Sequence, residues 1–194
     1  MRIHFSPDEF PWPKNGDKLV TATFGGSIAF LHFKTFSSYA SGYKRSADIL
    51  IEHIRQQESD QDLLVYPVIF LYRHYIELML KAIITIGQRV EGCDVQIPPH
   101  HKLENLWDDA KKIIRTHFPE EDNPASIVGN QILEFAKLDN SGEECRYPVL
   151  KSGEPSLEQL DKIDLENFSQ VIDRISVYLD TTYSMLHDYL QEML

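Results

Sequence analysis

Four ionisable side chains interrupt the longest apolar stretch of the chain, residues 66–84: Arg73, His74, Glu77 and Lys81. At about 100° per residue, a helix stacks His74, Glu77 and Lys81 along one side, with Arg73 at its margin. Histidine can transfer a proton near neutral pH, and the planar guanidinium of arginine suits a phosphate. Because the rest of the stretch is apolar, the helix is expected to be buried. Its polar stripe must then face solvent as an ion-paired surface, line an anion-binding groove, or meet partners from elsewhere in the chain.

A second group of ionisable residues, His100 and His101, comes just before the next predicted helix. His101 occupies a helix N-cap position and can be structural, or it can act in proton transfer. Two adjacent histidines point in different directions, and Cys93 and Cys145 have no zinc-ligand spacing. The sequence therefore predicts no metal site and no cofactor.

The third group lies in a long segment without helical periodicity, residues 138–156, and comprises Asp139, Ser141, Arg146 and Tyr147. Loops of this length in a compact domain are often functional. Two interpretations stay open: an ion pair between Asp139 and Arg146 braces the loop, or Arg146 lies beside the stripe as an anion clamp. We expect residues 139–148 to fold into a groove lined by the stripe, since buried charges need paired partners.

Apolar residues recur at helical spacing through most of the chain and predict the elements that position these groups. The predicted fold is all-α, a bundle of about five helices. The helices are expected over residues 43–57, 66–87, 102–117, 124–138 and 164–194. Pro67 is expected in the first turn of the second helix, and Ser59, Asp60 and Asp62 can cap it.

Residues 1–34 are expected to form an irregular extension or a short β-hairpin, because three prolines break the beginning and Gly25-Gly26 suggests a turn. The remaining residues, 35–194, are expected to form the bundle. Within it, residues 165–193 carry apolar side chains at alternating spacings of three and four. This seam predicts packing within the bundle or a homodimer through the long C-terminal helix.

The formal charge of −11, from 30 acidic and 19 basic residues, disfavours diffuse binding to nucleic acid. RNA or a nucleotide would need a local basic groove. Four ionisable groups make membrane insertion of residues 66–84 costly, and the N-terminus does not have the pattern of a secretion signal. With two cysteines, the chain is expected to be a cytoplasmic protein with no membrane contact.

Three segments in this order, RHYIELMLKAI (73–83), HKLENLW (101–107) and LDNSGEECRYP (138–148), precede a long terminal helix. Over residues 43–190 the chain resembles bacterial proteins of the HEPN superfamily. The resemblance implies a bundle of four or five helices. Members include metal-independent ribonucleases of toxin–antitoxin and phage-defence systems, and non-catalytic modules that bind RNA or nucleotides.

Catalytic HEPN proteins use an arginine separated from a histidine by four to six residues, and this sequence holds no such pair. The sequence therefore favours a binding module for RNA, a nucleotide or a protein partner, with Arg73, Glu77, Lys81 and the third group as its ligand-binding residues. The alternative is a divergent metal-independent ribonuclease. In it His74 or His101 would act on the 2′-hydroxyl or the leaving oxygen, while Arg73 and Arg146 stabilise the charge of the transition state.

Overall fold

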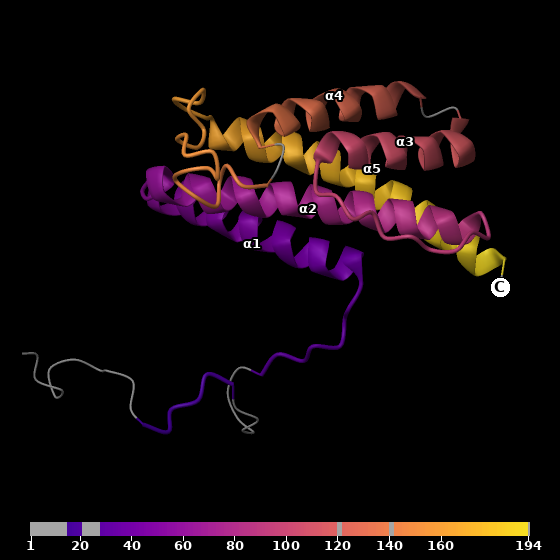
Figure 1. The fold of residues 1–194 in the computed structure, drawn as a ribbon, viewed down its shortest axis with the longest axis horizontal. Helices are drawn as coiled ribbons and strands as arrows, with labels where there is room; N and C mark the ends of the chain where they lie inside the picture. The colour runs from indigo at the N-terminus through magenta and orange to yellow at the C-terminus, as the bar shows by residue number, and fades with distance from the viewer. Residues whose placement is uncertain (1–14, 21–27, 120–121, 140–141, 194) are drawn as a thin grey trace, which may run out of the picture. The chain divides into compact units, whose positions relative to one another are not determined.

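Among the residues that the structure describes after the N-terminal extension, five α-helices form a bundle (Figure 1). The computed structural model describes residues 15–20, 28–119, 122–139 and 142–193. The helices are α1 (Phe36–Gln57), α2 (Gln61–Val90), α3 (Leu103–His117), α4 (Asp122–Leu138) and α5 (Leu165–Glu192). Among the described residues, the β pairing is limited to an isolated bridge between Val149 and Pro155. These findings confirm the predicted all-α bundle.

Residues 1–32 and 33–194 are separate units. In the first unit, the described residues form turns and bends with neither helix nor strand, and the rings of Phe30 and His32 stack with centroids 5.5 Å apart. The Gly25-Gly26 turn of the predicted hairpin falls outside the described residues.

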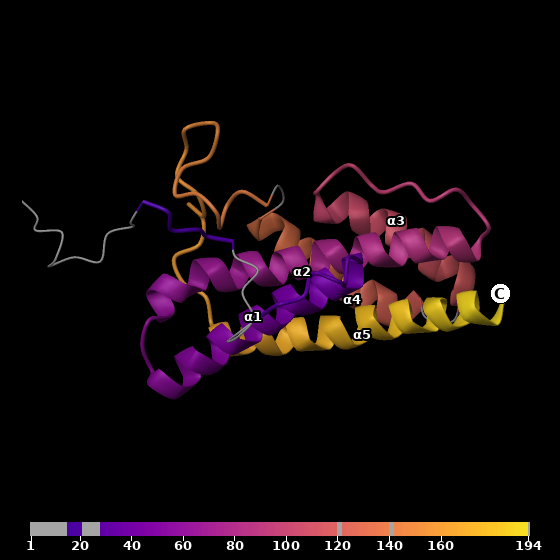
Figure 2. The ribbon, with the colours of Figure 1, turned by 90° about the horizontal axis from the view of Figure 1, so that it is seen from below.

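Helix α2 is the centre of the bundle and packs against α1, α5 and α3, while α4 packs on α3 and touches α5 more sparsely (Figures 1 and 2). Its residues 68–87 are buried almost without interruption, and Ile69, Ile76, Leu80 and Ile83 are among the fully buried side chains. This burial follows from a helix that is apolar around most of its circumference.

Helices α1 and α2 begin several residues before the predicted positions, and α4 begins at Asp122, two residues before its predicted start. Helix α1 begins at Phe36, before the predicted Tyr43, because Thr35 and Ser38 form a reciprocal capping box. Helix α2 begins at Gln61, so Pro67 lies in its second turn and not in the first. Asp60 occupies the N-cap position of α2, but its side chain makes no capping hydrogen bond.

The seam of α5 faces the interior of its own bundle along its central part. Ile172, Ile175, Leu179 and Leu186 are buried, and α5 packs directly on α2. Bundle packing therefore explains the near-heptad pattern over these residues, and the homodimer stays a prediction.

Helix α2 also carries an 18-residue window of mean hydropathy 1.4, which is long and apolar enough to cross a bilayer. Within the bundle, 56% of that window is buried. Core helices of soluble proteins and membrane spans share this combination of length and composition.

Candidate functional site

Arg73 lies in the interior of the bundle, with 1% of its surface exposed, and its guanidinium joins α2 to two separate loops. Nε donates to the carbonyl of Asp139 (2.9 Å), and Nη2 donates to the carbonyl of His101 (2.6 Å). Nη1 donates to Oε2 of Glu77, one helical turn away (2.8 Å). These charge-assisted bonds fix the loop before α3 and the loop after α4 against the same point of α2.

Glu77 is the acceptor at the centre of this arrangement and is 2% exposed. Its Oε1 accepts from Nζ of Lys81 (3.1 Å) and lies 2.7 Å from Nδ1 of His101. Nδ1 of His74 lies 3.9 Å from Oε2. Burial alone would raise the pKa of Glu77, but contacts with His74, His101, Arg73 and Lys81 outweigh it and hold the pKa far below its usual range.

Asp139, the first residue after α4, is fully buried and completes the cluster. Its Oδ1 accepts from the backbone N–H groups of Gly142 (2.6 Å) and Glu144 (3.3 Å), while Oδ2 lies 3.7 Å from Nε of Arg73. Gly142 has a φ of +79°, and a Cβ there would lie 2.8 Å from Nη1 of Arg73. The loop can lie flat on the guanidinium because this residue is a glycine.

Arg73, Glu77, Lys81 and Asp139 are hereafter called the buried charge cluster. It contains two cationic and two anionic side chains and is electrically neutral. Neutrality is expected because an unpaired buried charge costs several kcal/mol. The three stripe residues therefore do not form a solvated face and do not line an open groove. Arg73 and Glu77 take partners from the two loops, the third of the arrangements that the sequence left open, while Lys81 pairs with Glu77 within α2.

The remaining residue of the stripe, His74, keeps 26% of its side chain exposed. Its ring stacks on Phe70 at 5.8 Å between centroids and meets the edge of Tyr43 from α1 at 4.4 Å. Aromatic rings on two sides hold this histidine in place beside the buried charge cluster.

His101 is the histidine whose position suits acid–base chemistry. Glu77, with its lowered pKa, is ionised and can only accept, so Nδ1 of His101 must carry the shared hydrogen. The side chain is 65% exposed. A carboxylate that fixes one ring nitrogen and leaves the other free to take a proton is the arrangement of a general base.

Arg146 lies at one end of the stripe, as the loop was expected to place it, and not in an ion pair with Asp139. Its guanidinium carbon lies 5.8 Å from the ring centroid of Phe70 and 5.7 Å from that of Tyr147. Its Nε donates to the carbonyl of Gly142, the residue that covers Arg73. Both Arg146 and Tyr147 are exposed, whereas Ser141 lies outside the described residues.

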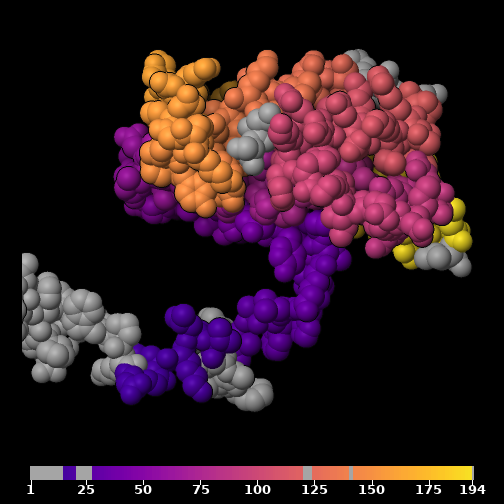
Figure 3. All heavy atoms as spheres, in the orientation of Figure 1, coloured from indigo at the N-terminus to yellow at the C-terminus, as the bar shows by residue number. Residues whose placement is uncertain are grey.

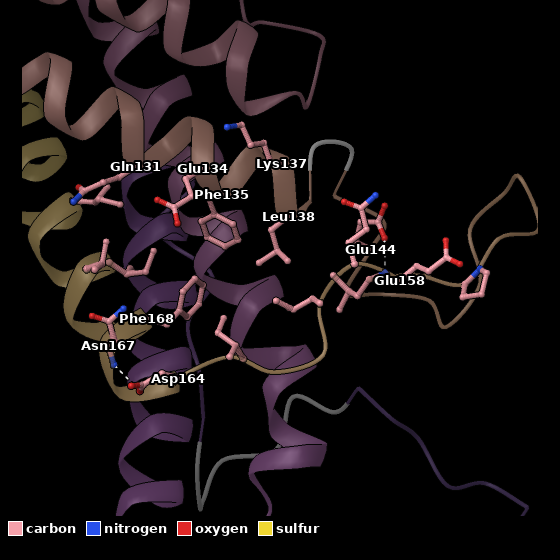
Figure 4. Close-up of a pocket in the computed structure, with 18 of the residues that line it drawn as sticks. Gln131, Glu134, Phe135, Lys137, Leu138, Glu144, Glu158, Asp164, Asn167 and Phe168 are labelled. Carbon is pink, nitrogen blue, oxygen red and sulfur yellow. Dashed lines mark hydrogen bonds between the residues drawn. The ribbon is translucent and has the colours of Figure 1, made fainter.

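The segment 142–164 lies over the first turns of α2 (Figure 3) and separates two clefts. One cleft, of about 700 Å³, lies between this segment and the start of α2, where Arg146 and Tyr147 contribute to its lining. The other, of about 710 Å³, lies between α4, α5 and the segment (Figure 4).

Sequence reasoning missed this second cleft, because its lining comes from three separate parts of the chain. The signal that could have indicated it is the length of the segment between α4 and α5. The length alone predicts a functional loop, and the sequence links that loop only to the stripe.

Within the described ranges, no group of three His, Cys, Asp or Glu side chains is arranged to hold a metal ion. In comparisons with known proteins, no family model, no curated protein and no solved structure matches the chain.

Proposed function

We propose that the chain is a HEPN-like binding module without the standard HEPN chemistry, and that the molecule it binds is a protein. The observation that carries this proposal is the placement of Arg73, the arginine expected to hold a phosphate. It is 1% exposed, and three of its nitrogens are bonded to other groups of the chain. An arginine held in this way acts as a brace between helix and loops.

The charge of the chain supports a protein partner over a nucleic acid. At −11, the surface repels a phosphate backbone, and binding through counterion release needs clustered lysines and arginines. The basic groove that RNA or a nucleotide would need is not formed by the stripe, whose Arg73 and Lys81 are both buried. The bacterial defence setting, the cytoplasmic location and the homodimer remain parts of this proposal.

A divergent ribonuclease is the second candidate function, and the contact between Glu77 and His101 favours it. In this mechanism His101 would take the proton of the 2′-hydroxyl while its oxygen bonds to phosphorus and the bond from phosphorus to the 5′-oxygen breaks, the leaving oxygen taking a proton from water. The exposed Arg146 would stabilise the negative charge on the non-bridging phosphoryl oxygens. His74 would be the alternative base. Arg73 could act only by orienting these groups, since its own nitrogens are engaged.

The deciding experiment incubates the purified chain with total RNA at neutral pH, with and without EDTA, beside His101→Ala and His74→Ala proteins. We expect no cleavage by any of them. Cleavage by the parent that persists in EDTA and is lost in one histidine variant would replace the binding module with the ribonuclease.

A second experiment tests the class of partner by capturing the tagged chain from its source cells, with and without ribonuclease treatment of the lysate. A protein partner should stay bound after the RNA has been digested. If the treatment releases everything captured, the partner is RNA or is held through RNA, and a protein-binding role is ruled out.

A further inference from the structure

The cleft between α4 and α5 is an interhelical groove that the bundle leaves partly open. Helix α4 packs mainly on α3 and touches α5 at few points, and the segment 142–164 closes one end (Figure 4). At the base of the cleft, the rings of Phe135 from α4 and Phe168 from α5 meet edge to face, with centroids 5.3 Å apart. This aromatic pair fixes the two helices relative to each other and leaves the space above it unfilled.

The floor of the cleft is apolar and incompletely covered. Its side chains come from the end of α4, from the segment and from the first half of α5. Several of them are only half-buried: Leu138, Leu157, Leu160, Ile163 and Val171. Apolar surface of this kind inside a concave site is typical of a place where another molecule binds.

The rim of the cleft is acidic. Its ionisable side chains are five carboxylates and one ammonium: Glu134, Glu144, Glu154, Glu158, Asp164 and Lys137. Glu144 accepts from the backbone N–H of Leu157, and Asp164 caps α5. Glu134, Glu154 and Glu158 are exposed and surround an apolar floor.

We propose that this cleft binds a basic amphipathic helix of the partner protein, an inference that rests on the proposed function. A helix matches a cleft formed between two helices, because its apolar side chains at every third or fourth position can enter the floor together. Lysines or arginines on its flanks would pair with the carboxylates of the rim. The same carboxylates repel nucleic acid and anionic lipid. A small polyamine buries less apolar area against the floor than a row of leucine side chains does, so the floor favours the helix.

The experiment titrates the full chain into a fluorescent peptide of leucine and lysine, about 14 residues or four turns long, whose leucines lie on one helical face. Anisotropy reports binding. The first control peptide has the same composition in an order that spreads leucine around the helix, and the second replaces lysine with glutamate. We expect only the amphipathic leucine–lysine peptide to bind tightly, and neither control peptide to do so. Free spermidine at equal charge should not displace the bound peptide.

Two charge-reversal variants separate the cleft from the general acidity of the chain. The pair Glu134→Lys and Glu158→Lys changes the rim. The matched pair Asp188→Lys and Glu192→Lys makes the same change in net charge on exposed residues of α5, about 20 Å beyond the cleft. The rim variant should bind about tenfold more weakly than the parent, and the matched variant should bind nearly as well as the parent.

The floor is tested with Val171→Ser, because Val171 lines this cleft and not the other one. The circular dichroism of this variant should match that of the parent, while peptide binding falls by about tenfold. Equal weakening by the two charge-reversal variants would show diffuse attraction and overturn the inference. Binding of the scrambled peptide, or displacement by spermidine, would do so as well. The RNA incubation and the capture experiment are independent of these peptide measurements. Failure of this inference would therefore leave the proposed binding module untouched.

Discussion

Glu77→Gln is the substitution that most directly tests the role of the buried charge cluster. It removes one of two anionic charges from a neutral group of four and leaves Arg73 and Lys81 with Asp139 as their one remaining counterion in the cluster. Breaking a buried ion pair by removing one partner costs about 3–5 kcal/mol. Glutamine keeps an acceptor oxygen and nearly the same volume, so we expect the lower end, about 3 kcal/mol. That is a large fraction of the roughly 5–15 kcal/mol by which native proteins are stable.

The matched control is Glu52→Gln, which removes an ion pair of similar geometry from the surface. Glu52 Oε2 lies 2.6 Å from Nη1 of Arg55, a shorter distance than the 2.8 Å between Glu77 and Arg73. Both members of the surface pair keep about half of their side chains exposed. Water and salt already screen such a pair, so its loss should leave the stability almost unchanged.

Urea unfolding followed by circular dichroism measures both variants at neutral pH. A destabilisation of Glu77→Gln below about 1 kcal/mol, or one equal to that of Glu52→Gln, would refute the argument. The cluster would then be hydrated or loosely paired, and burial would not decide its energetics.

The same unfolding measured against pH checks the sign of the effect. The pKa of Glu77 is lowered in the folded state, so its contribution is fully present above the unfolded value of about 4.3 and is lost as the pH falls further. The difference between parent and Glu77→Gln should therefore shrink as the pH falls below about 4.3, where the carboxylate is protonated in the unfolded chain first. A difference that grows as the pH falls below about 4.3 would contradict the lowered pKa of Glu77.

Two further predictions concern the loop after α4. Gly142→Ala should cost about 2–4 kcal/mol in urea unfolding, because the left-handed backbone is strained and the new Cβ would lie 2.8 Å from Arg73 Nη1. Gly153→Ala has a similar φ of +89° and nothing within 4 Å, so it should cost only about 1–2 kcal/mol; equal costs would mean that the contact with Arg73 is unimportant. Burial raises the pKa of the Cys145 thiol to about 12, with Asp139 and Glu144 adding to the rise, whereas Cys93 is exposed. A thiol reagent at pH 8 should therefore modify one cysteine quickly in the folded chain and both in denaturant, and fast modification of both would show that the loop opens.

The sequence predicted the helices well because each carries its own signal. Apolar periodicity placed α3 within one residue of its start, and Asp164 was recognised at the start of α5, where its side chain accepts from the N–H of Asn167. The early start of α1 was missed, since a Thr–Ser capping box lacks the glutamate that usually marks one. Apolar periodicity and capping patterns are sufficient where the contacts that form a helix lie within one or two of its own turns.

The environment of the stripe could not be predicted in this way. Its polar spacing was clear, but whether it meets solvent, a groove or the chain depends on contacts with distant residues. Arg73 bonds to the carbonyl of His101, 28 positions away, and to that of Asp139, 66 positions away. Both acceptors are backbone oxygens, which every residue carries, so the side-chain sequence gives no sign of them. The sequence suggested an ion pair between Asp139 and Arg146, which are close together in the chain. In the structure Asp139 instead lies beside Arg73, which is distant in the chain.

The buried charge cluster and the cleft are joined through Glu144, which gives a last prediction. The backbone N–H of Glu144 donates to Asp139 Oδ1, and its side chain accepts from the N–H of Leu157 on the cleft floor. Loosening the cluster should therefore let the segment 142–164 shift and weaken binding of the leucine–lysine peptide. Under conditions where Glu77→Gln is folded, it should bind the peptide about two- to fivefold more weakly than the parent does. This corresponds to a loss of about 0.4–1 kcal/mol of binding free energy. Glu52 is not part of the hydrogen bonds that run from Asp139 through Glu144 to Leu157, so Glu52→Gln should bind the peptide like the parent. Unchanged affinity in a folded Glu77→Gln protein would mean that the segment holds its position without the cluster, and that Arg73 braces the helices without shaping the cleft.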